Sequence, residues 1–133
     1  MAAPLTADDS HYLTALAEAI SQVSVAQNRL MVEVVTMSQT PAILQDAGWQ
    51  ARYDAAMEGL VQAANRLRVE PVPDTMRLVD ATLARAQSEV RQAASGLDDV
   101  GHAAKPDSIV RSLRHLDRMA QLLQQARARV PTG

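Results

Sequence analysis

The chain has no cysteine and no phenylalanine, and aromatic residues make up only 2% of its 133 residues. The absence of cysteine excludes disulfides, thiolate metal sites, cysteine nucleophiles and covalent haem attachment. With so few aromatic side chains, the core must be built from Leu, Val, Met and Ala, a set dominated by helix-forming residues. Five glycines and six prolines are also too few for an all-β fold with many turns.

Charge and hydropathy do not point to nucleic acid or to a membrane span. The formal net charge is −2, so the whole molecule has no electrostatic attraction for nucleic acid or anionic lipid. The longest apolar run is far shorter than the ~20 residues that cross a bilayer, so we expect no transmembrane segment. The opening residues, MAAPLTADD, lack the basic and hydrophobic parts of a signal peptide. They would equally suit the start of a mature exported chain, so the localisation stays open.

Four segments, separated by proline-containing breaks, carry apolar residues at spacings that alternate between three and four. Such spacing places the apolar residues on one side of a helix. The first segment has Leu13, Leu16, Ile20, Val23, Leu30, Val34 and Met37. The second has Trp49, Tyr53, Ala56, Leu60, Ala63 and Leu67. The third has Met76, Val79, Leu83, Ala86, Val90, Ala93, Leu97, Val100 and Ala104. The fourth has Ile109, Leu113, Leu116, Ala120, Leu123 and Val130.

This pattern predicts an all-α protein, with helices at about 8–38, 42–68, 74–104 and 107–130. Thr40 and Pro41 suit the start of the second helix, and Asp74 suits the cap of the third. Short connections favour a single domain, 1–133, folded as an antiparallel up-down-up-down four-helix bundle. Two chains that exchange helical hairpins would show the same pattern.

The stretch GLDDVGHAAKPDS, residues 96–108, has the composition of a metal or catalytic site. Asp99 and His102 are three residues apart and would share a helix face. Bundle di-metal sites also need Glu-x-x-His motifs, and the sequence contains none. We therefore interpret the stretch as a helix end loosened by glycines, followed by a turn at Pro106.

Haem and nucleophilic catalysis are no better supported. His11, His102 and His115 all lie off the apolar faces, and a methionine on such a face is typical of core packing. No nucleophile elbow, glycine-rich phosphate loop or pair of buried carboxylates is found. We therefore predict no catalytic, cofactor-binding or metal-binding residues and no enzymatic activity.

Two features are candidates for ligand contacts or for contacts at a bundle end. Gln27 is the one polar residue set into the apolar face of the first segment, where a buried amide would fix helix register or touch a ligand. Trp49 and Tyr53 are one turn apart beside Gly48. They would close one end of the bundle with their polar atoms at the solvent edge, or line a small apolar pocket.

A third feature is an arginine face on the last segment, formed by Arg111, Arg114, Arg118 and Arg129. It lies opposite the apolar residues of that segment and is a candidate interaction face for an acidic partner protein. A nucleic-acid surface would also need aromatic residues and an overall basic charge, so we expect no nucleic acid. A solvated helix face is the alternative.

From Trp49 onward the chain resembles a loose group of exported bacterial four-helix domains, which are often tethered as lipoproteins. Trp49, Leu67, Arg68, Pro71 and Pro73 carry the resemblance, which spans residues 49–130. The cysteine that would carry the lipid is absent, as in a trimmed chain. The resemblance implies a non-enzymatic, extracytoplasmic helical module of bacterial origin.

The sequence thus predicts a helical bundle that is structural or binds a protein partner, a homodimer included. The alternative is a bundle that holds a small apolar ligand or cofactor between its helices near Trp49 and Tyr53.

Overall fold

The computed structural model describes residues 6–98 and 106–130, and across these residues the regular structure is entirely helical. The α-helices in this part of the chain are α1 (Ala7–Gln39), α2 (Ala47–Asn65), α3 (Arg77–Asp98) and α4 (Pro106–Ala128). Two 3₁₀ segments, η1 (Pro41–Gln45) and η2 (Asp74–Met76), precede α2 and α3. The predicted all-α class is therefore confirmed for the described residues.

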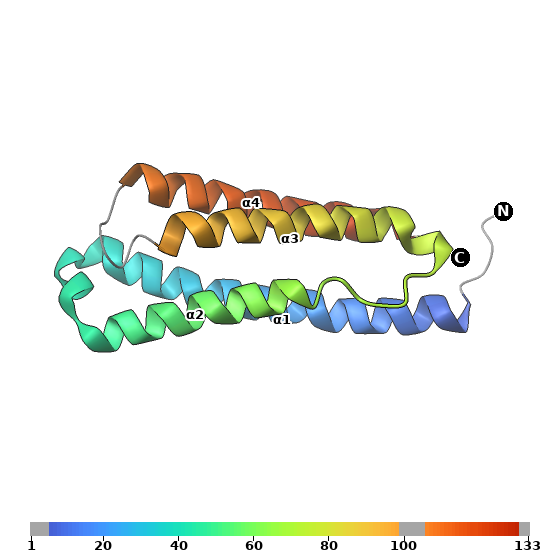
Figure 1. Ribbon diagram of the computed structural model, residues 1–133, viewed down its shortest axis with the longest axis horizontal. Coiled ribbons are helices and arrows are strands. Elements are labelled where there is room, and N and C mark those ends of the chain that lie inside the picture. Colours follow the sequence, from blue (N-terminus) through green and yellow to red (C-terminus); the bar gives the residue numbers. More distant parts are fainter. Residues whose placement is uncertain (1–5, 99–105, 131–133) are drawn as a thin grey trace.

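The helices form two close pairs, α1 with α2 and α3 with α4 (Figure 1). In the first pair, Arg66 near the end of α2 bonds Gln22, whereas Arg52 near its start meets Glu33. Residue numbers therefore rise along one helix as they fall along the other, which makes this pair antiparallel.

The α3–α4 pair is antiparallel for the same reason. The Arg129 guanidinium, beyond the end of α4, donates to the Thr82 hydroxyl at 2.6 Å, and His115 contacts Glu89. The two pairs meet chiefly through α2 and α3.

All four helices contribute to one apolar core. Each apolar residue that the helical spacing assigned to the core, and whose side chain is described, is buried or half-buried. The largest fully buried side chains are Trp49, Tyr12, Tyr53, Leu30, Leu60, Leu67, Met76, Leu83, Leu116, Met119 and Val23. At ~1.5–3 kcal/mol per buried large apolar side chain, this core is the main stabilising contribution to the fold.

The second helix is shorter than the predicted 42–68. Pro41 begins a 3₁₀ segment, and Thr40 makes no side-chain cap. The cap of α2 is Asp46, whose carboxylate accepts a hydrogen bond from the Trp49 backbone N–H at 3.0 Å. At the other end of α2 the backbone forms a tight turn, in which the N–H of Leu67 donates to the carbonyl of Ala64, three residues earlier.

The third helix was expected to begin at residue 74, but α3 begins at Arg77 because its first turn is the 3₁₀ segment η2. Asp74 makes no side-chain cap and instead pairs with Arg77 at 2.8 Å. The expected continuation of this helix over 99–104, including Asp99 and His102, lies outside the described residues.

Candidate functional site

A groove runs along the outer side of the α1–α2 pair. We define the α1–α2 groove by Val25, Arg29 and Val32 on α1 and by Arg52, Ala55 and Gly59 on α2. It consists of two depressions that share Arg29. One lies beside Val32 and Ala55, and the other lies beside Val25 and Gly59.

The walls of the groove combine exposed valines with small residues. Val25 and Val32 are 50% and 62% exposed, and Val35, further along α1, is 46% exposed. The α2 side of the groove carries Ala55 and Gly59, which are too small to fill the space between the helices. An exposed valine alone needs no explanation, but three on one side of one helix form an apolar surface.

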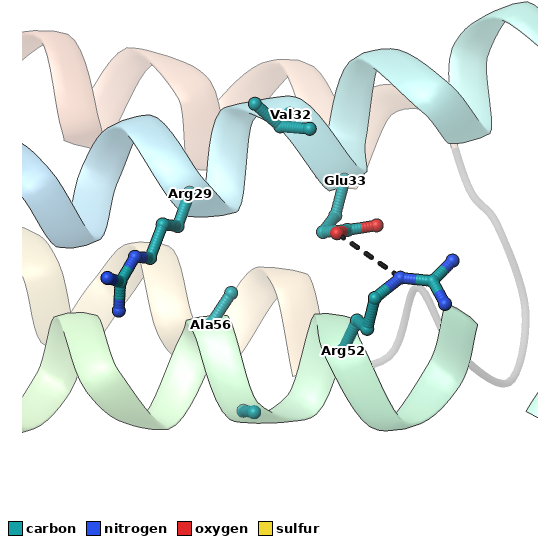
Figure 2. A pocket seen from close by; sticks show the side chains of 6 residues that line it. Arg29, Val32, Glu33, Arg52 and Ala56 are labelled. Carbon is teal, nitrogen blue, oxygen red and sulfur yellow. Dashed lines mark ion pairs between the residues drawn. The ribbon is translucent and has the colours of Figure 1, made fainter. Parts of the chain in front are cut away.

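Charged groups of the groove come mainly from arginine. Arg52 pairs with Glu33 at 3.5 Å, and Arg66, toward the other end of the groove, donates to the Gln22 side chain at 3.0 Å. Arg29 has no hydrogen-bond or ion-pair partner among the described residues. Figure 2 shows Arg29 reaching from α1 toward α2, on the other side of Ala56 from the Arg52–Glu33 pair. Arg29 is therefore a cation available to a partner.

Trp49 and Tyr53, the predicted pocket or end residues, are packed inside the protein. Their rings stack with centroids 5.1 Å apart, and they are 0% and 2% exposed. The Trp49 indole N–H donates to the Glu33 backbone carbonyl at 3.3 Å, so this polar atom bonds α1 rather than reaching the solvent edge as expected. Neither ring lines the α1–α2 groove.

Gln27 is only half-buried, so the expectation that it sits squarely in the core is wrong. The buried polar side chains in the described part of the chain are Asp9, Thr82, Gln87 and Ser112. Gln87 donates to the Asn65 side chain at 3.1 Å and thereby links α3 to the end of α2. Gln87, rather than Gln27, is thus the buried glutamine that makes a hydrogen bond between two helices.

The arginine face of α4 is exposed, as its position opposite the apolar residues indicates. Arg111, Arg114 and Arg118 are all exposed. Arg129 differs because its guanidinium donates to Thr82 on α3, which commits part of its hydrogen-bonding capacity within the chain. The structure thus brings three of the four arginines together as a solvent-facing row.

A polar cluster that the sequence did not reveal joins the start of α1 to η2. Thr6 and Asp9 form a capping box, in which each side chain accepts a hydrogen bond from the other residue's backbone N–H. The Thr75 hydroxyl also donates to the Asp9 carboxylate at 2.6 Å. The Thr75 and Thr6 hydrogen bonds lower the pKa of Asp9 below its usual value. This cluster links the start of α1 to η2, two segments that are far apart in the sequence.

Beside this cluster, the Tyr12 hydroxyl is buried and has no hydrogen-bond partner among the described residues. Burial, followed by the negative charge of Asp80, raises the pKa of Tyr12 to about 12. Asp80 itself receives two hydrogen bonds, at 3.0 and 2.9 Å, from the Arg68 guanidinium. Arg68 and Asp80 therefore act within the fold, because they connect α3 to the segment after α2.

Within residues 6–98 and 106–130, no three His, Asp or Glu side chains gather closely enough to hold a metal ion. His11 is exposed. His115 Nδ1 lies 2.6 Å from Glu89 Oε2, a contact that joins α4 to α3. The described helices also include none with the length and apolar content of a membrane span.

Comparisons with protein-family models, curated proteins and solved structures give no match to this chain.

Proposed function

We propose that this chain is a non-enzymatic helical module that binds another protein or a second copy of itself. The observation that carries the proposal is the exposed apolar surface on α1, where Val25, Val32 and Val35 face away from the core. Apolar side chains gathered on one side of a helix are typical of a surface that a partner covers. The small residues of the adjoining α1–α2 groove add room for that partner.

As part of this proposal, the four helices close as one antiparallel up-down-up-down bundle within a single chain. The antiparallel contacts of α1 with α2 and of α3 with α4 support it, and so does the further contact of α2 with α3. Such a bundle is a rigid scaffold, on which exposed helix faces hold fixed positions for a partner. The resemblance of residues 49–130 to exported bacterial helical domains is the basis for proposing a bacterial, extracytoplasmic module.

Native mass spectrometry of freshly purified protein tests this function against its alternative. The bare chain mass, or twice that mass, is the expected result. A reproducible additional mass that is lost on denaturation would overturn the proposal. It would favour the alternative, a small apolar ligand or cofactor held near Trp49 and Tyr53.

Hairpin exchange between two chains would also give twice the chain mass. Mixing isotopically labelled with unlabelled protein separates the two cases. Subunits that dock through exposed faces trade partners rapidly, whereas exchanged hairpins trade only as fast as the chain unfolds.

A further inference from the structure

The α1–α2 groove has the spacing of a helix-binding site. Its two depressions are lined by Val25 and Val32, which are seven residues apart on α1. At 1.5 Å per residue, this spacing corresponds to ~10 Å along the groove. Side chains at positions i and i+7 of a second helix have the same separation and point the same way. A helix laid along the groove would therefore place one apolar side chain in each depression.

Gly59 keeps one depression open. A Cβ added at this position would meet no atom within 4 Å, so space remains directly above the backbone of α2. A glycine within a helix costs ~0.5–1 kcal/mol relative to alanine, and close approach of another chain is one of the reasons for using it. The depression beside Gly59 therefore has room for an inserted side chain at the backbone of α2.

Charge identifies the chemistry of the occupant. Arg29 lies where the two depressions meet and has no partner among the described residues, and Arg52 and Arg66 stand toward the two ends. The acid on the groove wall, Glu33, is already paired with Arg52. This positive groove lies on a molecule of net charge −2. A carboxylate beside Arg29 would form a charge-assisted hydrogen bond.

A second copy of the chain fits the groove less well than an acidic partner does. A homodimer that pairs this face with itself has a two-fold axis through it. Because Arg29 is central, the axis would bring Arg29 close to its own copy, and like charges at an interface are unfavourable. The charge arrangement thus favours a different protein.

We propose that the α1–α2 groove binds an acidic amphipathic helix of another protein. Two apolar side chains of that helix, about seven residues apart, enter the depressions beside Val25 and Val32, and a carboxylate contacts Arg29. This inference rests on the proposed function, since it names the partner chemistry of an interaction module.

The test begins with a display library of helical peptides of about 18 residues, roughly the length of α2, selected on the wild-type protein. The tightest peptide is then made with a fluorescent label and titrated by anisotropy against four variants. Gly59→Leu fills a depression, and Gly59→Ala is its matched control. Arg29→Glu reverses the central charge, and Arg114→Glu makes the same change on the exposed face of α4. Circular dichroism verifies that each variant is folded.

We expect acidic peptides to be enriched. Their affinity should fall at least about tenfold for Gly59→Leu and Arg29→Glu, the size of effect typical of central interface residues. It should change less than about twofold for Arg114→Glu, which lies outside the proposed contacts. Gly59→Ala adds only a methyl group to the depression, so its affinity should lie between those of the wild type and Gly59→Leu. A twin peptide with lysine in place of its central acid should recover affinity for Arg29→Glu.

The contrary outcomes separate this inference from the proposed function. Peptides that lose affinity for Arg114→Glu, but not for Gly59→Leu, would overturn the groove and leave an interaction module that uses α4. Basic or neutral peptides would overturn the acidic partner. A homodimer that Gly59→Leu dissociates would assign the groove to a second copy. A selection that yields no binder, with the protein monomeric, would overturn both proposals.

Discussion

Two glycines in one helix give a direct test of the local structure, because the same substitution should have different effects at each. Gly59 lies in the interior of α2, and an added Cβ would contact nothing within 4 Å. Gly48 lies in the first turn, and its Cβ would be 3.0 Å from the carboxylate of Asp46. That carboxylate accepts the hydrogen bond from the Trp49 backbone N–H that caps α2.

Gly59→Ala should therefore stabilise the protein by ~0.5–1 kcal/mol, since alanine loses less backbone entropy on folding and no neighbour must move. Unfolding entropy is ~2.1 cal/mol/K per residue, or ~0.28 kcal/mol/K for a chain of 133 residues. The melting temperature should then rise by about 2–4 °C. Thermal unfolding followed by circular dichroism at 222 nm measures this shift, and urea unfolding gives the free energy independently.

Gly48→Ala is the matched control. Displacing the Asp46 carboxylate would weaken a helix cap worth ~0.5–2 kcal/mol, which offsets or exceeds the gain in helix propensity. We expect no stabilisation, or a small loss. An equal gain at both positions would refute the described capping geometry, and a loss at Gly59 would refute the open space above α2.

Three further predictions concern the contacts between helices. Tyr12→Phe should stabilise the protein by ~1 kcal/mol, because it removes a buried hydroxyl without a partner. Burial raises the pKa of Tyr12 to about 12, so its phenol ionises at a lower pH in the unfolded chain than in the folded one. Urea unfolding of the wild type should therefore show a loss of stability as the pH rises from ~10 to ~12. The same loss in Tyr12→Phe would contradict this assignment. Asp9→Asn should be less stable at neutral pH and should flatten the acid limb of the stability profile. The lowered pKa of Asp9 means that its contribution is present above the ordinary carboxyl pKa and is lost as the pH falls through the folded value. Thr75→Val keeps the carboxylate but removes a hydrogen-bond donor, so an acid limb left unchanged by Thr75→Val would be inconsistent with the Thr75 hydrogen bond. A double-mutant cycle with Glu89→Ala and His115→Ala should give a coupling of ~0.3–1 kcal/mol by urea unfolding at pH 6, and a coupling of zero would show that the contact carries no energy.

Sequence periodicity was sufficient for the core because apolar residues at alternating spacings of three and four can be buried together only on a helix. It identified Leu16, Leu30, Leu60 and Leu83 as core residues, and all four are buried. It was less successful at helix ends, where a single hydrogen bond determines which residue begins the helix. The capping oxygen of α2 belongs to Asp46 rather than to Thr40, and only coordinates distinguish between two nearby residues of similar capping preference.

Polar residues were harder to place than apolar ones. Gln27 fits the apolar periodicity of α1 yet is half-buried, whereas Gln87 lies beside the periodic positions of α3 and is buried. The difference depends on which helix covers each flank, and a single sequence does not contain that information. The pairing of Asp9 with Thr75 joins residues 66 positions apart and is likewise a product of topology.

The sequence does contain an indication of the α1–α2 groove, although a search for core residues does not detect it. Val25, Val32 and Val35 follow one another at spacings of seven and three, the same helical periodicity as the core residues but on a different side of α1. In the described part of the chain, α1 buries its other apolar side in the core, and these three valines stay exposed. The sequence of a helix with two apolar sides therefore predicts one side that packs in the core and a second side that contacts a partner. The groove residues on α2, Ala55 and Gly59, could not be found in this way, because small residues mark a groove only when the opposite wall is known.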